Sequence, residues 1–336
     1  NTNEYFKILG ILLILFYIYI MKLNILDSQN DDNPLLALTL LIFGVLILSL
    51  QDALIKMMSS ETTFWQLQFL RSICNIILLI LIAYYTNGLK ILFPINWKPV
   101  YLRAFMMTCC MFCFFSASPI LSVAQMAAGL YTYPLFVSIM AFTILKEKMG
   151  IWRLSALVLG SLGALMILQP WSNDFIYVQL LPVLAGFFYA SNIILIRKYC
   201  RKESVMSLTL AVGLMFFISA TIGTIFFEFI YVSEAFIKEM PFIALGWPQL
   251  TMIVFCFAII CSFLNLFGNL CLAKAYQSAE SSWLAPLDYS YLFFAAIWSK
   301  LLFGFWPTNM NLVGICFIAF SGILIAWREK VKKVVR

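Results

Sequence analysis

The chain has 336 residues, of which 63% are hydrophobic and 11% charged, with a mean hydropathy of +0.97. A soluble domain carries roughly a quarter charged residues, so this composition excludes a water-soluble protein. The apolar runs are continuous over about 20 residues, the length that a helix needs to cross a bilayer. We therefore expect an all-α integral membrane protein, because each segment must satisfy its own backbone polar groups in lipid. The net charge of +7 comes from cations in short loops and the tail, which favours an orientation signal over nucleic-acid binding.

Some function classes are excluded by what the sequence lacks. It contains no histidine, which removes the usual zinc ligand and every nucleophile that depends on a histidine base. It has no G-x-x-x-x-G-K-[ST] phosphate loop, so direct ATP drive is excluded. Most of the nine cysteines lie inside apolar runs, and even the C-x-x-C of Cys110 and Cys113 favours packing over redox or metal chemistry. We expect no metal and no cofactor.

Residues 1–33 form an N-terminal extension with a hydrophobic segment. Tyr5–Met21 is an apolar run of borderline span length, and a polar stretch follows it. Three interpretations compete: an extra helix outside the core, an uncleaved signal-like segment, or sequence upstream of a start at Met21. No small-residue cleavage site follows the run, which disfavours a removed signal peptide. We favour an extra helix or an extension, and the sequence does not separate the two.

Ten apolar spans follow, joined by linkers that are mostly too short to hold a separate domain. The predicted spans are 35–57, 63–85, 98–117, 120–145, 151–169, 177–197, 205–228, 249–273, 281–303 and 309–327. They make a first five-helix unit at 34–170 and a second at 177–327. The basic cytoplasmic tail at 328–336 is expected to anchor to anionic lipid heads.

The distribution of lysine and arginine predicts an orientation for these spans. If the first core span starts inside, sixteen cations, Arg103 among them, fall in cytoplasmic loops or the tail. The four on the opposite side or at its span ends are Lys56, Arg71, Lys238 and Lys300. The positive-inside rule then places both core termini in the cytoplasm, and we expect a multi-pass protein of the cytoplasmic (inner) membrane.

The two five-helix units are similar in sequence. Aligning Gly163 with Gly322 brings GALMI over GILIA, and a nearby alignment brings YTYPLF over DYSYLF. In the first and sixth spans, Gln51 and Asn192 fall in register. Because five is an odd number, the second unit must enter the membrane from the opposite side. An inverted repeat of this kind is associated with alternating-access carriers.

The chain resembles the drug/metabolite transporter (DMT) superfamily, EamA-type family, over essentially all of 34–330. The residues that carry the resemblance are LQDALIK (50–56), FLR (69–71), YPLFV (133–137), KEK (146–148) and APLDY (285–289). The resemblance implies ten transmembrane helices in two inverted five-helix repeats that move a small organic solute through a central cavity. The sequence departs from the family pattern before the last span, where Trp306 replaces a glutamate whose counterpart in the first unit is Glu147.

Ionisable residues inside the first two spans are candidates for substrate binding or coupling, because such residues are costly in a bilayer. Asp52 and Lys56 share one helix face, so Asp52 either forms an ion pair with Lys56 or takes part in gating. Gln68 and Arg71 belong to a polar stripe on the second span. Arg71 either binds a substrate carboxylate or phosphate through its planar fork or pairs with Asp52, and we favour the pairing.

The ninth span holds the strongest candidate, Asp288. It lies about 10 Å into the span and next to Pro286, which weakens the helix and frees backbone carbonyls that can line a cavity. Its carboxylate is expected to bind a cationic substrate group or to carry a proton. The structural alternatives are a lysine partner or a neutral hydrogen-bonded acid. Trp283 and Tyr289 are expected pocket walls for a flat or cationic ligand.

Other residues are expected mainly to join helices. Asn265 and Asn269 on the eighth span are candidates for solute recognition, although interhelical hydrogen bonding is the commoner role. Ala156, Gly160 and Ala164 recur at every fourth position of the fifth span. This spacing of small residues predicts close helix packing.

We predict a secondary transporter that moves a small organic metabolite by alternating access. The resemblance admits amino acids, nucleoside-type metabolites such as an S-adenosylmethionine-like compound, and lipophilic cations. Among these, the opposite charges of Arg71 and Asp288 favour a zwitterion. The alternatives are an integral-membrane enzyme, a channel, or an exporter of lipophilic cations. The lack of histidine argues against an enzyme, and the lack of a filter segment or charge ring argues against a channel. Expected partners are the solute, the bilayer and a proton or counter-substrate, in a monomer or homodimer.

Overall fold

The computed structural model describes residues 34–85, 88–146, 151–169, 171–172, 175–230, 233–278 and 287–334. These ranges consist of helices and their connections. The helices are α2 (Pro34–Met58), α3 (Phe64–Tyr85), η1 (Leu89–Leu92), α4 (Trp97–Ser116), α5 (Val123–Leu130), α6 (Tyr133–Thr143), α7 (Ile151–Leu168), η2 (Tyr177–Leu180), α8 (Leu181–Tyr199), α9 (Val205–Phe229), α10 (Glu234–Glu239), α11 (Pro241–Ala244), α12 (Met252–Ser278), α14 (Ser290–Phe303) and α15 (Asn309–Val334). The predicted extension 1–33, Glu147, Trp283 and Pro286 lie outside the described residues.

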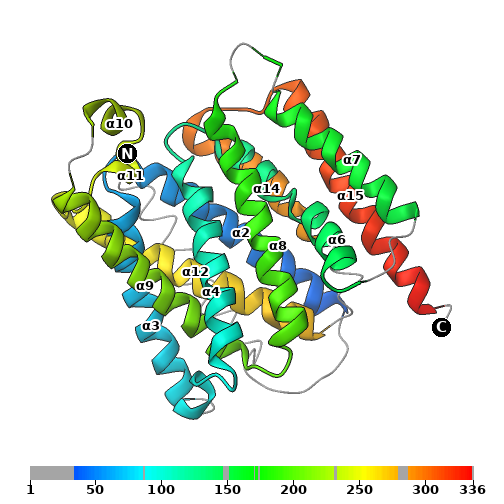
Figure 1. The fold of residues 1–336 in the computed structure, drawn as a ribbon, viewed down its shortest axis with the longest axis horizontal. Coiled ribbons are helices and arrows are strands. Elements are labelled where there is room, and N and C mark those ends of the chain that lie inside the picture. The colour runs from blue at the N-terminus through cyan, green and yellow to red at the C-terminus, as the bar shows by residue number, and fades with distance from the viewer. Residues whose placement is uncertain are drawn as a thin grey trace.

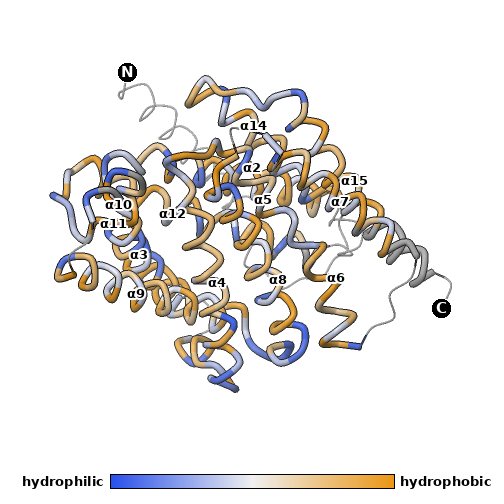
Figure 2. The backbone as a smooth tube through the Cα atoms, turned by 45° about the horizontal axis from the view of Figure 1, so that its top comes forward, coloured by the Kyte–Doolittle hydropathy of each residue, from blue (hydrophilic) through white to orange (hydrophobic). Residues whose placement is uncertain are grey.

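Many of these helices have the length and composition of membrane spans. Within the described ranges, seven stretches qualify: Leu35–Met58, Phe64–Tyr85, Trp97–Ser116, Val123–Thr143, Tyr177–Tyr199, Val205–Phe229 and Met252–Leu272. Three shorter apolar helices are found at Leu154–Leu168, Ser290–Phe303 and Asn309–Leu324. Figure 2 shows hydrophobic helices with hydrophilic stretches gathered mostly in the connections. The prediction of a multi-pass, all-α membrane protein is thereby confirmed.

The helices of the first unit pack mainly on helices of the second. α2 packs along α12, α4 along α8, α3 along α9 and α7 along α15. In Figure 1, α7 and α15 run side by side at one edge of the bundle, and α3 and α9 lie toward the opposite edge. This pattern is symmetric between the units. α2 of the first unit packs along α12 of the second, and their counterparts in the other unit, α8 and α4, also pack together. The largest buried apolar core lies between α2, α4, α5, α12 and α14.

Two of these helix pairs meet at glycines. A Cβ atom on Gly44 of α2 would lie 3.0 Å from the carbonyl oxygen of Gly268 on α12. A Cβ atom on Gly163 of α7 would lie 2.7 Å from the carbonyl oxygen of Gly314 on α15. Small residues allow such close approach of backbones in a membrane. The packing predicted at Gly160 is also confirmed, because a Cβ atom there would lie 2.5 Å from a leucine side chain of α6.

The predicted fourth span, 120–145, is not one continuous helix. It consists of α5 and α6, separated by a turn at 131–132. Pro134 lies in the first turn of α6, where it has no N–H to donate and its ring would clash with a carbonyl of the preceding turn in a continuous helix. The predicted ninth span has a similar turn at Tyr289, immediately before α14. Both units therefore interrupt their fourth helix at closely matching positions.

The connections lie at two ends of the bundle. We call the end where α2, α4, α7, α9 and α14 finish the Lys56 end, and the end where α3, α6, α8 and α12 finish the Lys90 end. At the Lys56 end, the long connection that contains α10 and α11 is held on α3, because Trp65 Nε1 donates to the Ile243 carbonyl oxygen at 2.7 Å.

The last helix, α15, continues to Val334, so the predicted tail at 328–336 extends that helix through most of its length.

Contacts at the Lys90 end also join the two units. The Glu203 carboxylate accepts hydrogen bonds from the backbone N–H groups of Ile95 at 2.9 Å and Asn96 at 2.7 Å. The Ser204 hydroxyl, at the N-terminus of α9, donates to the Ile91 carbonyl oxygen at 2.6 Å. The connection before α4 is therefore held by the connection before α9.

We predict that Gly163→Ala lowers the thermal unfolding midpoint of the detergent-purified protein by several degrees. The new methyl group meets the backbone of α15, which cannot turn away, and overpacking of this kind costs about 1–3 kcal/mol. Gly213→Ala is the matched control, because its Cβ atom would meet the flexible Ile76 side chain at 3.2 Å. Equal midpoints for the two variants would contradict the close crossing of α7 and α15.

Candidate functional site

A chain of polar side chains crosses the bundle from α12 through α2 to α14. Asn265 Nδ2 donates to Gln51 Oε1 at 2.9 Å, and Gln51 Nε2 donates to Asp52 Oδ1 at 2.9 Å. Asp52 Oδ2 accepts a hydrogen bond from the Tyr291 hydroxyl. Gln51 is buried, with 2% of its surface exposed. The polar chain thus links the two units inside the helix bundle, where water is scarce and each polar group needs a protein partner.

A cluster of tyrosines surrounds the two interrupted helices. The tyrosine cluster comprises Tyr131, Tyr133, Tyr189, Tyr289 and Tyr291. Tyr131, in the turn between α5 and α6, stacks on Tyr291 with ring centroids 5.2 Å apart and planes at 22°. Its hydroxyl donates to the backbone carbonyl oxygen of Asp288 at 3.2 Å, so the two interruptions are in direct contact. The cluster and the polar chain share Tyr291 and form one centre.

Asp288 lies at this centre and is half-buried. Its backbone carbonyl accepts from Tyr131, whereas its carboxylate has no hydrogen bond or ion pair within the described part of the chain. Tyr289, the neighbouring candidate, is buried and packs edge-on against Tyr131 at 5.5 Å. A carboxylate without a structural partner in a membrane protein is available for a ligand or a proton.

Asp52 and Lys56 have different partners, although they share a helix face. Asp52 is bonded to Gln51 and Tyr291. The Lys56 ammonium donates to the Ser118 carbonyl oxygen and lies 5.4 Å from the centroid of a phenylalanine ring on α14. In place of the ion pair considered from the i,i+4 spacing, Asp52 bonds to Gln51 of its own helix and to Tyr291 of α14, and Lys56 bonds to the connection after α4.

Arg71 is buried, with 5% of its surface exposed. Its Nη1 donates to Gln68 Oε1 at 3.4 Å, and its guanidinium lies 6.0 Å from the centroid of the Phe115 ring. Asp52 attracts this charge through space, but the hydrogen-bond partner of Arg71 is Gln68 rather than Asp52. Arg71 Nε is buried without a hydrogen-bond partner among the described residues. The guanidinium therefore keeps donors that an anionic group could use.

The two asparagines on α12 differ in their surroundings. Asn265 makes the interhelical bond to Gln51 described above, which is the commoner role expected for it. Asn269 is exposed and donates back to the Asn265 carbonyl oxygen of its own helix at 2.7 Å. The same face of α12 carries Ser262, whose hydroxyl donates to the Arg71 carbonyl oxygen at 3.2 Å. Asn269 thus bonds within its own helix, to the residue that joins α12 to α2.

Arg103 is an important polar residue that the sequence interpretation missed. It was counted among the cytoplasmic cations, yet it lies inside α4, where its Nε donates to Asn192 Oδ1 at 2.7 Å and its Nη1 donates to the Leu208 carbonyl oxygen at 2.9 Å. It joins α4 to both α8 and α9. The corresponding contact in the other half is that of Asn265 with Gln51, because Gln51 of α2 aligns with Asn192 of α8. The alignment of these two amide side chains was the feature of the sequence that indicated an amide contact in each half.

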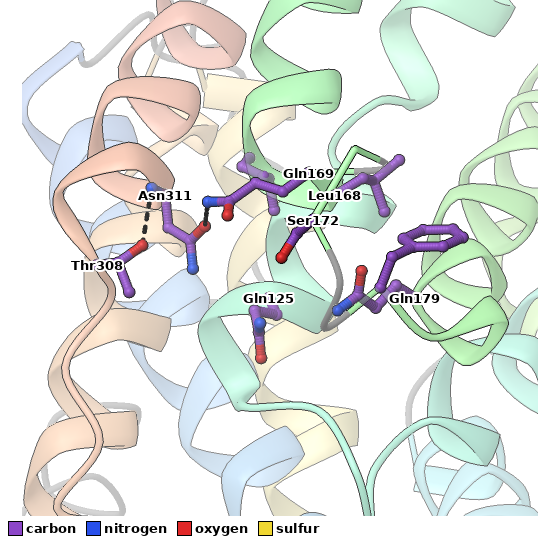
Figure 3. Close-up of a pocket in the computed structure, with 9 residues that line it drawn as sticks. Gln125, Leu168, Gln169, Ser172, Gln179, Thr308 and Asn311 are labelled. Atoms are coloured by element: carbon purple, nitrogen blue, oxygen red, sulfur yellow. Dashed lines mark hydrogen bonds between the residues drawn. The ribbon is translucent and has the colours of Figure 1, made fainter.

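A cavity of about 150 Å³ lies away from this centre, at the Lys56 end. It is formed by α5, α7, the connection after α7 and the start of α15 (Figure 3). None of the described candidate residues named from the sequence lines it. The polar centre and the cavity are therefore separate features of the bundle.

The fold and the centre define a multi-pass helical membrane protein whose two related units meet at interrupted, tyrosine-rich helices. The model of the EamA-like transporter family matches residues 35–169 and 176–327, and the chain belongs to this family. The family assignment confirms the resemblance seen in the sequence. It indicates a transporter rather than an enzyme.

Two relatives of this chain are named for the compounds that they transport. A riboflavin transporter of Vibrio cholerae is 30% identical over 212 residues, which are 61% of this chain and 63% of that protein. An S-adenosylmethionine uptake transporter of Rickettsia prowazekii is 26% identical over 284 residues, or 84% of this chain and 89% of that protein. The match thus spans less than two thirds of the riboflavin transporter. A solved crystal structure with 14% identity covers 86% of this chain and 96% of its own with a TM-score of 0.56, which shows a shared fold alone.

We predict that Arg103→Ala destabilises the protein more than Arg201→Ala does. Removal of the Arg103 side chain leaves the buried Asn192 amide and a carbonyl of α9 without their charged donor, and such bonds contribute about 1.5–3 kcal/mol. Arg201 is the control, because it is exposed and donates to the Arg197 carbonyl oxygen of the preceding turn of its own chain segment. Thermal unfolding of both variants in detergent measures the difference, and equal midpoints would contradict the tie between α4 and α8.

Proposed function

We propose that this protein carries a small metabolite with a flat ring system across the inner membrane by alternating access. The tyrosine cluster, together with Asp52 and Asp288, forms the binding centre in this proposal. The observation that carries it is the contact of two interrupted helices, one from each unit, through the Tyr131 hydroxyl and the Asp288 carbonyl. Interrupted helices at a repeat interface supply backbone carbonyls and side chains to substrates near the middle of the bilayer.

The substrate class is supported by the chemistry of the centre and by the names of the relatives. Tyrosine rings offer flat apolar faces, on which aromatic rings stack favourably. Riboflavin and S-adenosylmethionine, the compounds named for the two relatives, both contain a flat nitrogen-containing ring system joined to a hydroxylated carbon chain or sugar. A ligand of this kind would replace the stack of Tyr131 on Tyr291 with its own ring.

The inverted architecture is supported by the helix pairing. The four most extensive helix pairings all join the two units, and this set of four is unchanged when the units are exchanged. We propose ten membrane-spanning helices in two inverted repeats, 34–170 and 177–327. In this topology the Lys90 end faces the cytoplasm, in agreement with the excess of lysine and arginine there.

Alternating access requires the contacts at one end to open while those at the other end hold. The Lys56 end is held by Trp65 on the Ile243 carbonyl and by Lys56 on the Ser118 carbonyl. The Lys90 end is held by the Glu203 carboxylate and, deeper in the bundle, by Arg103. We propose that these two sets of contacts open in turn around the tyrosine cluster, which lies between them.

Asp288 has the coupling role in this mechanism. Its carboxylate has no partner in the described chain, so it can bind a cationic group or accept a proton without breaking a structural bond. Asp52 is different, since its two carboxylate oxygens already have partners on α2 and α14. We propose that Asp52 holds α14 in place through Tyr291, so that Tyr291 stays against Tyr131.

The test is counterflow in proteoliposomes with riboflavin and S-adenosylmethionine. We expect saturable uptake that is stimulated by the same compound inside the vesicle, which a channel or an enzyme would not show. Asp288→Asn should abolish this uptake and Asp288→Glu should retain part of it, because glutamate keeps the titratable carboxyl group. Equal uptake by the wild type and Asp288→Asn would remove Asp288 from the site.

The buried Arg71 predicts a difference between the two compounds. S-adenosylmethionine carries a carboxylate that the free guanidinium donors of Arg71 can bind, whereas riboflavin carries none. Arg71→Gln should therefore reduce S-adenosylmethionine transport at least tenfold, with a smaller effect on riboflavin. Arg71→Lys, which keeps the positive charge, is the control for loss of charge. An equal loss of both substrates would indicate a structural role for Arg71.

A further inference from the structure

The cavity at the Lys56 end has the composition of a binding site. Its polar lining residues are Gln125, Gln169, Ser172, Gln179, Thr308 and Asn311, and Phe175 contributes an aromatic wall. Figure 3 shows these residues around the space between α5, α7 and α15, and the amide oxygen of Gln125 accepts from the N–H and the hydroxyl of Ser122. The lining joins both units, since Thr308 and Asn311 belong to the last helix of the second unit and its N-terminus.

The chemistry of this lining selects for neutral polar groups. Four amides and two hydroxyls line the cavity, and each of these groups both donates and accepts hydrogen bonds. None of the described lining residues carries a charge. A hydroxyl-bearing or amide-bearing ligand satisfies such a lining, whereas an isolated ion would find no opposite charge among the described lining residues.

Some of these groups have hydrogen-bonding capacity to spare. Gln179 Oε1 is buried without a hydrogen-bond partner among the described residues. Gln169 Nε2 reaches Asn311 Oδ1 only at 3.5 Å, beyond the usual range for such a bond. Buried polar atoms are normally paired with protein or ordered water, so an unpaired acceptor beside a cavity marks a place for a donor from a water molecule or a ligand.

The backbone conformation of Gln169 is a second indication that the cavity binds a ligand. This residue follows the last turn of α7 with a φ of +44°, in the left-handed region that favours glycine at the end of a helix. A glycine would end the helix without strain. Glutamine in the same position keeps the strain and gains an amide that reaches toward Asn311 across the cavity. Strained backbone of this kind persists where the side chain has a use.

We infer that this cavity binds the neutral hydroxylated part of a substrate on its way to or from the tyrosine cluster. This inference rests on the proposed function. A volume of about 150 Å³ is several times that of a water molecule but below the usual size of a pocket for a whole metabolite. It therefore suits a short polyol chain or a ribose, while the flat ring of the same molecule lies outside. Its place at the Lys56 end makes it an access subsite on the side opposite the cytoplasm in the proposed topology.

Cysteine protection tests the binding directly. Ser172→Cys places a thiol in the cavity lining, and Trp171→Cys places one on the exposed neighbouring residue. We expect ribitol, a neutral five-carbon polyol, to slow the reaction of the Ser172→Cys thiol with a membrane-impermeant reagent at least threefold. Ribitol should leave Trp171→Cys unchanged, and sodium propionate should protect neither. The wild type provides the background of native cysteines.

Transport kinetics test the role of the cavity in access. Gln179→Leu removes the unpaired acceptor and should raise KM for riboflavin about five- to tenfold. The maximal rate should stay close to that of the wild type, since the tyrosine cluster is untouched. Leu180→Ala is the control, because the neighbouring Leu180 is exposed and does not line the cavity.

The outcomes separate this inference from the proposed function. Identical modification rates with and without ribitol, or an unchanged KM in Gln179→Leu while the wild type transports, would overturn the subsite and leave a water-filled cavity. Protection by ribitol in a protein that transports neither compound would overturn the proposed function and keep the binding site.

Discussion

The structure depends on the need of every polar group inside a helix bundle in lipid to find a protein partner. Water is not available there, and an unpaired group costs several kcal/mol. In this protein many Ser and Thr hydroxyls donate to a carbonyl of the preceding turn of their own helix, whereas several amide, arginine and tryptophan side chains find partners in the opposite unit. Asn265 bonds to Gln51, Arg103 bonds to Asn192, and Trp298 Nε1 donates to the Ser49 hydroxyl at 3.0 Å. The two units are thus interlocked by their polar residues as well as by the close glycine crossings.

The same constraint explains why the interrupted helices lie at the interface of the units. A turn within a span leaves backbone carbonyls without helical partners, and these must be met by other side chains. Tyr131 meets the carbonyl of Asp288, and the Thr132 hydroxyl donates to the Gly129 carbonyl at 2.7 Å. The interruptions are therefore tolerated where the two units can satisfy each other. At this place a substrate could replace these contacts at a small cost in free energy.

Much of the fold could be predicted because hydrophobic length is a local property. The predicted seventh span, 205–228, agrees with α9 almost to the residue. The break in the fourth span was not predicted, although Pro134 was noted, because proline alone does not distinguish a kink from a turn. The candidate site was predicted less completely. Gln68, Arg71 and Asp52 were named, but the role of Arg103 was missed, since a cation near a span end resembles a loop cation in the sequence.

The sequence by itself determined the membrane class, the position of the spans, the internal repeat and the family resemblance. These properties depend on composition, on runs of about 20 residues and on motifs read along the chain. The tertiary structure alone decided the partner of each polar group. Helical spacing puts Asp52 and Lys56 on one face, but packing directs Asp52 to Tyr291 and Lys56 to the Ser118 carbonyl. Periodicity specifies which face of a helix is polar, whereas the neighbour that meets this face is set by how helices far apart in the sequence pack together.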